Sequence, residues 1–166
     1  VESAQKRVEG NNYDARKQVL QYDDVLRKQR EIMYAERNEV LENEVVTDIV
    51  YDMIDEAVEK TIQYASQTMG EVHSEREETE EIIKSINEKF LGQNPITELE
   101  YGDVMSDEEI KELTINKIKA ELQEKRELLG DDTMNSFEKY ILLNAIDDRW
   151  TDHIDQMDQL RKGIFL

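Results

Sequence analysis

The 166-residue chain contains no cysteine, one proline and six glycines. The lack of cysteine excludes a disulfide framework, a thiolate metal site and a thiol nucleophile, and it fits a reducing cytosol. So few glycines and prolines argue against an all-β fold or a P-loop enzyme, both of which need more turns. No stretch approaches 18 uncharged apolar residues, and the first residues lack a signal-peptide pattern. We therefore expect no membrane-spanning segment and no secretion signal.

Basic residues are also scarce, with 21 against 40 acidic residues and a formal net charge of −19. Binding of nucleic acid or of anionic lipid needs clustered lysine and arginine, so both classes of partner are disfavoured. The charge is uneven, because residues 71–110 hold 13 acidic and three basic residues, whereas residues 1–45 and 134–166 each have a net charge of −2. This pattern indicates two near-neutral segments that flank an acidic insert.

Apolar residues recur at helical spacing along most of the chain, which predicts an all-α fold of long helices with a smaller helical insert. The first long helix is expected over residues 13–42, after a break at Gly10–Asn12, with Gln29 and Glu36 interrupting its apolar stripe. Two capping boxes, Ser74 with Glu77 and Ser106 with Glu109, predict helix starts. The last helix is expected to be capped by residues 131–133, after Gly130 ends the helix before it.

The carboxylates and the two histidines do not form a recognisable metal or catalytic site. A di-metal bundle needs Glu-x-x-His, but Trp150 stands three residues before His153, and Gly70 stands three before His73. Residues 103–109 lack the spacing of a Ca²⁺ loop. We interpret His153 as a hydrogen-bonded structural residue, His73 as a loop residue and Trp150 as core, and we expect no catalytic, metal-binding or cofactor-binding residue.

One polar cluster near the start of the long helix suggests a contact with another domain or protein. Tyr13, Asp14 and Arg16 gather donors and a carboxylate beside the expected turn, and helix capping with surface charge is the alternative. The other arginines of this helix, Arg27, Arg30 and Arg37, have acidic residues close in sequence and are expected mostly to be solvated or paired within the helix.

Residues 1–25 and 137–164 closely resemble SecA, the motor ATPase family of bacterial preprotein translocation. The resemblance implies a first long scaffold helix over 1–42, a helical wing domain over 43–133, and over 134–166 the first helix of a two-helix finger, truncated at its tip. The ATP- and magnesium-binding motor would lie outside this chain. We therefore expect no enzymatic activity here and a cytoplasmic location, with the parent protein peripheral at the inner face of the plasma membrane.

The resemblance also implies partners: the SecA motor domains, the preprotein and the SecY channel complex. We expect motor contact at Tyr13, Asp14 and Arg16, and polypeptide or channel contact at Ile164, Phe165 and Leu166, where Phe165 replaces a histidine common in the family. The uncovered apolar stripe of the finger helix predicts self-association. The alternative function is a free-standing acidic helical module that binds a partner helix.

Overall fold

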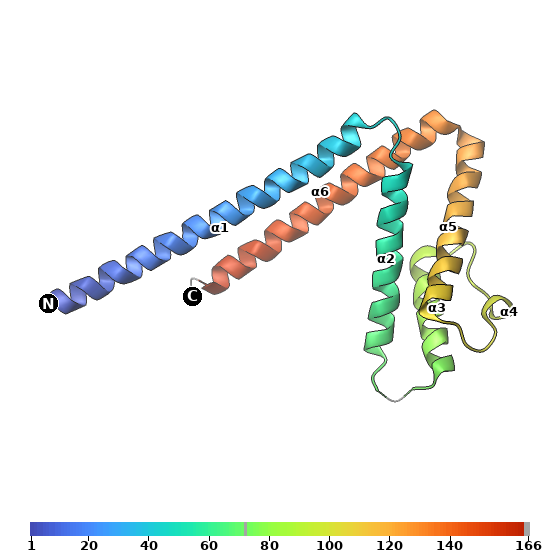
Figure 1. Cartoon of the computed structure of the whole chain (residues 1–166), viewed down its shortest axis with the longest axis horizontal. Coiled ribbons are helices and arrows are strands. Elements are labelled where there is room, and N and C mark those ends of the chain that lie inside the picture. The colour runs from blue at the N-terminus through green and yellow to red at the C-terminus, as the bar shows by residue number, and fades with distance from the viewer. Residues whose placement is uncertain (72, 165–166) are drawn as a thin grey trace. The chain divides into compact units, whose positions relative to one another are not determined.

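The computed structural model describes residues 1–71 and 73–164, and every regular element within them is an α-helix (Figure 1). The predicted all-α fold is confirmed. The helices, in chain order, are α1 (Glu2–Glu42), α2 (Thr47–Thr68), α3 (Glu75–Phe90), α4 (Glu98–Tyr101), α5 (Asp107–Leu129) and α6 (Asp131–Ile164).

The first helix is continuous, so the predicted break at Gly10–Asn12 is wrong. α1 runs for 41 residues, which at 1.5 Å per residue is about 60 Å. Gly10 is not among the glycines with positive φ. Glycine and asparagine lower helix propensity by about 1 kcal/mol or less each, whereas only proline removes a backbone donor and clashes with the preceding turn. These three weak helix formers therefore do not end the helix.

The chain divides into two units, each described here by itself. Val1–Glu44 and the part of the chain from Lys139 onward form the first, the helical pair; Val45–Glu138 form the second, the three-helix unit. α6 contributes its first eight residues to the three-helix unit and the rest to the helical pair.

The three-helix unit is built around one apolar core between α2, α3 and α5. Its fully buried members are Val58, Ile62, Ala65, Ile82, Ile83, Ile86, Leu91, Ile96 and Ile110. Burying each of the larger side chains stabilises the unit by about 1.5–3 kcal/mol relative to exposure. The core residues of α2 and α3 fall three or four positions apart, which places them on one face of each helix.

Local sequence signals fix the ends of these helices. Both predicted capping boxes are present, with Ser74 and Ser106 accepting from the backbone of Glu77 and Glu109. Gly130 ends α5 with φ of 89°, a conformation that favours glycine. Residues 131–133, which we expected to cap the last helix, instead form its first turn, because α6 begins directly after Gly130.

In the helical pair, α1 and the later part of α6 lie side by side and antiparallel (Figure 1). The half-buried residues of α1 include Val19, Tyr22, Leu26 and Met33, which recur at helical spacing and so lie on one face of the helix. Few residues of the pair are fully buried among those described: Val40, Leu142 and Ile146. The pair is therefore held by a narrow, partly polar seam rather than by a wide core.

Candidate functional site

The seam between α1 and α6 carries a half-buried polar contact near its centre. Gln29 Oε1 lies 2.5 Å from His153 Nε2, and both side chains are half-buried. The Trp150 ring lies against the same histidine, with ring centroids 5.7 Å apart and an interplanar angle of 36°. His153 is thus a hydrogen-bonded structural residue, as predicted. Gln29, which interrupts the apolar stripe of α1, is the residue that satisfies it.

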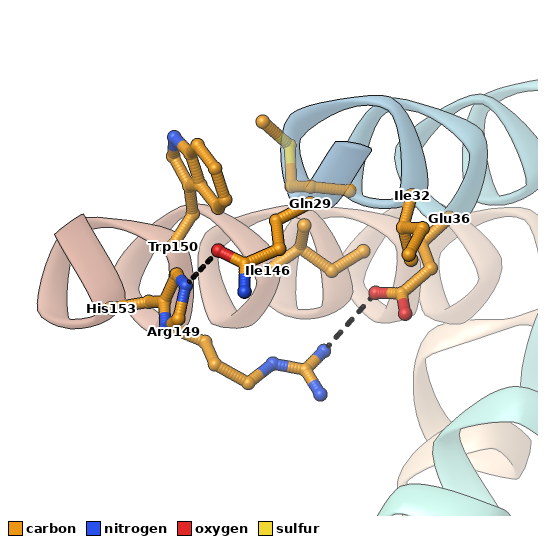
Figure 2. Close-up of a pocket in the computed structure, with 8 residues that line it drawn as sticks. Gln29, Ile32, Glu36, Ile146, Arg149, Trp150 and His153 are labelled. Carbon is orange, nitrogen blue, oxygen red and sulfur yellow. Dashed lines mark hydrogen bonds and ion pairs between the residues drawn. The ribbon is translucent and has the colours of Figure 1, made fainter. Parts of the chain in front are cut away.

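Two ion pairs extend the seam toward the end of α1. Arg37 donates from Nε and Nη2 to the two carboxylate oxygens of Asp147, at 3.0 and 3.3 Å. This bidentate contact lowers the pKa of Asp147 below its ordinary value, and the carboxylate in turn raises the pKa of Arg37. Arg149 Nη2 lies 3.6 Å from Glu36 Oε2 (Figure 2). Glu36, the second polar interruption of the stripe, therefore also has a partner on α6.

The arginines of α1 differ in their partners. Arg27 pairs within the helix, with Asp24 at 2.7 Å and Glu31 at 3.1 Å, as predicted. Arg37 instead reaches a residue 110 positions away, which the sequence analysis missed. The only sequence signal for the Arg37–Asp147 pair is that each carries a charge beside an apolar stripe, and that signal does not fix the register of two helices.

Two apolar grooves open along the seam. The first, of about 280 Å³, is lined by Gln29, Ile32, Met33, Glu36, Ile146, Arg149, Trp150 and His153 (Figure 2). The second, of about 450 Å³, is lined by Gln18, Gln21, Tyr22, Val25, Met157, Leu160 and Arg161. Ile32 is 62% exposed and Leu160 54%. Trp150, which the periodicity places in the core, is half-buried and forms part of a groove wall.

The first 18 residues of the chain, nearly all of them in α1, are exposed. Apolar side chains are among them, with Val8 58% and Tyr13 67% exposed. This stretch is about 27 Å long at 1.5 Å per residue, and most helical stability in proteins comes from tertiary packing of one helix face. It is therefore an unpartnered helix surface within the part of the chain that the structure describes.

The three residues predicted to contact the motor lie on this exposed stretch. Tyr13 and Arg16 are three positions apart and share a helix face, whereas Asp14 and Arg16 are two apart and do not face each other. Among the described residues, Asp14 and Arg16 make no ion pair with one another or with any other side chain. The structure thus brings two of the three together and turns the third away.

The second group of predicted contact residues lies at the end of the described chain. Ile164 is the last residue of α6. Phe165 and Leu166 lie outside the described residues. Their role in contacting a polypeptide or channel stays a prediction.

Across residues 1–71 and 73–164, no group of three or more histidine and acidic side chains is placed to hold a metal ion. In the same residues, none of the helices combines the length and the hydropathy that crossing a bilayer requires.

A comparison with protein families agrees with the resemblance seen in the sequence. The model of the family described as SecA Wing and Scaffold domain matches residues 1–166, the whole chain. This part of SecA is a non-catalytic region, so the match relates the chain to protein translocation without relating it to the ATPase motor. The chain belongs to the SecA Wing and Scaffold domain family.

Proposed function

We propose that this chain is a non-catalytic coupling element of a SecA motor. It passes ATP-driven motion of the motor domains to a preprotein that moves through the SecY channel, at the cytoplasmic face of the membrane. The observation that carries the proposal is the family match over all 166 residues. ATP and magnesium bind to the motor domains in this account, and no residue of this chain takes part in the hydrolysis.

The exposed first half of α1 supports a contact with the motor domains. A helix of 41 residues is longer than the helical pair needs, since residues 2–17 are exposed and the second groove begins only at Gln18. Tyr13 and Arg16 offer an aromatic ring and a forked cation on one face of that stretch. Tyrosine and arginine are the residue types that most often dominate the energy of an interface. We therefore place the motor contact on this face.

The contacts between α1 and α6 in the helical pair support the transmission of motion from α1 to α6. Ion pairs and the Gln29–His153 contact fix α6 to α1 at several points along its length. Motion imposed on α1 is therefore carried to α6, whose far end is Ile164. The two apolar grooves beside the seam fit an apolar helix or an extended apolar segment of a partner.

The test is to add the chain to a SecA motor that lacks this region and to measure binding and the ATPase rate. We expect saturable binding and a changed rate. Arg16→Ala should weaken binding by about fivefold or more, which is the roughly 1 kcal/mol that marks an energetically important interface residue. The matched control is Arg30→Ala, because Arg30 is also exposed on α1 but lies outside the first 18 residues.

An unchanged ATPase rate at saturating chain, without binding, would contradict the proposal and would favour a free-standing helical module. If Arg16→Ala and Arg30→Ala weakened motor binding equally, the coupling role would stand. The contact would then not lie on the face that carries Tyr13 and Arg16.

A further inference from the structure

The face of α1 that points away from α6 carries a line of exposed apolar side chains. Tyr13, Leu20, Tyr34 and Leu41 are each at least half exposed, and their positions differ by seven or fourteen residues. Seven residues are nearly two helical turns, so these side chains follow one line that is about 42 Å long at 1.5 Å per residue. Arg27 occupies the position midway along it. We call these five residues the outer stripe.

The outer stripe lies opposite the seam. Tyr22, Gln29 and Glu36 line the two grooves beside the seam, and each comes two residues after a member of the outer stripe. Two residues correspond to about 200° of rotation around an α-helix. The contacts that α1 makes with α6 therefore do not cover this line.

The outer stripe is symmetric about Arg27. An apolar side chain stands seven residues before Arg27 and another seven residues after it, and the same holds at fourteen residues. In an antiparallel pair of α1 helices centred on Arg27, Leu20 of each copy therefore faces Tyr34 of the other, and Tyr13 faces Leu41. A two-fold symmetric interface uses the same surface of both copies and requires it to be self-complementary. The pattern therefore fits a second copy of this chain.

The charges beside the outer stripe fit the same arrangement. Asp23 and Arg30 are exposed, and neither takes part in an ion pair among the described residues. They stand four residues before and three residues after Arg27, so in the antiparallel pair Asp23 of each copy lies beside Arg30 of the other. Arg27 is bound within its own helix by Asp24 at 2.7 Å and Glu31 at 3.1 Å, which offsets the repulsion between the two central guanidinium groups.

We infer that two copies of this chain associate through the outer stripes of their α1 helices, antiparallel and centred on Arg27. A polar residue within an apolar line fixes the register of paired helices at a cost in stability, and Arg27 has that role here. With one apolar residue in each seven, where a coiled coil has two, the association is weaker than that of a coiled coil. The inference goes beyond the proposed function, and it is tested without a motor.

Sedimentation equilibrium of the full chain, from micromolar to millimolar concentration, measures the association. We expect a reversible dimer. Leu20→Glu should raise its dissociation constant about tenfold or more, because each copy then places a carboxylate against Tyr34 of the other. The matched control is Ile32→Glu, since Ile32 is also exposed and also has an acidic residue four positions later, but lines the first groove. Circular dichroism checks that both variants keep their helix content.

Disulfide exchange tests the orientation and the register of the pair. The variants L20C and Y34C are prepared separately and mixed in a glutathione buffer, and the chain has no native cysteine that could interfere. We expect the disulfide between the two different variants to exceed either disulfide between like chains about tenfold or more, because only the former pair is held at a high effective concentration. Mass spectrometry separates the three products, since the two variants differ in mass.

Three results would overturn the inference. One is a chain that stays monomeric at millimolar concentration. Another is a dimer that Ile32→Glu weakens and Leu20→Glu leaves unchanged, because that dimer associates through the grooves beside the seam. The third is a preference for disulfides between like chains, which indicates a parallel pair in which the symmetry about Arg27 has no role. None of these results decides whether the chain binds a motor, so failure here is separate from failure of the proposed function.

Discussion

The two units of the chain differ in net charge and in the size of the apolar core that each of them buries. The three-helix unit holds 25 acidic and nine basic residues, a net charge of −16, and it buries a continuous apolar core. The helical pair is near neutral, at −3, and buries only Val40, Leu142 and Ile146 among its described residues. Acidity therefore accompanies the unit with the continuous apolar core, and near-neutrality accompanies the unit whose helices meet along a narrow seam.

This difference follows from what each unit buries. A core of branched aliphatic residues offsets the self-repulsion of a strongly charged surface, and that charge keeps the three-helix unit soluble and separate from like-charged proteins. The helical pair has grooves beside Trp150 and Leu160 and an exposed stretch of α1, where a strong net charge would oppose association. The proposed function therefore has its partner contacts on the helical pair.

The largest effect that separates the two units is expected from removing one core side chain. Ile86 is 0% exposed, whereas Ile32 is 62% exposed. Ile86→Ala should lower the free energy of unfolding of the three-helix unit by about 2–5 kcal/mol, through lost burial and a cavity. Ile32→Ala should change stability by about 0.5 kcal/mol or less. Urea unfolding followed by circular dichroism measures both, and equal losses would contradict the contrast between the units.

An intermediate effect is expected at a helix start of the three-helix unit. Ser106 caps α5 by accepting from the backbone of Glu109 at 3.2 Å. Ser106→Ala should destabilise the unit by about 1 kcal/mol, since one backbone donor of the first turn loses its partner. Ser136→Ala is the control, because Ser136 is exposed and lies within α6. Equal unfolding midpoints for the two variants would show that the Ser106 cap contributes nothing to stability.

The smallest effect is expected at an ion pair of the helical pair. Arg37 lowers the pKa of Asp147 from its ordinary value of 3.8. A lowered pKa in the folded state contributes stability above the ordinary pKa, and that stability is lost as the pH falls through the lowered value. An NMR titration should place the Asp147 midpoint below 3.8, and Arg37→Gln should raise it toward 3.8. Arg30→Gln is the control and should leave the midpoint in place; a midpoint insensitive to Arg37 would show that the pair does not form in solution.

The sequence predicts the local features of both units better than their contacts. The capping boxes at Ser74 and Ser106 and the helix stop at Gly130 were predictable, because each depends on residues within one turn. The break at Gly10–Asn12 was wrongly predicted, because weak helix formers do not force a helix to end without proline.

The contacts between helices were not predictable in the same way. The contact of Gln29 with His153 and the pair of Arg37 with Asp147 both depend on the register of two antiparallel helices. A periodic stripe identifies the facing side of each helix and leaves that register open. The polar residues Gln29 and Glu36 within the apolar stripe indicate polar partners on another helix, but the sequence does not identify those partners. The hydrogen bonds of Arg126 on α5 to Thr47 on α2 and Glu138 on α6 likewise depend on how these helices pack.

The central claim, that partners bind the helical pair and leave the three-helix unit alone, is tested most directly by hydrogen exchange. The full chain is measured with and without a SecA motor that lacks this region. We predict that motor binding slows exchange in residues 1–18 and leaves exchange in the core segments of α2, α3 and α5 unchanged. Slowed exchange confined to the three-helix unit, with residues 1–18 unaffected, would contradict it.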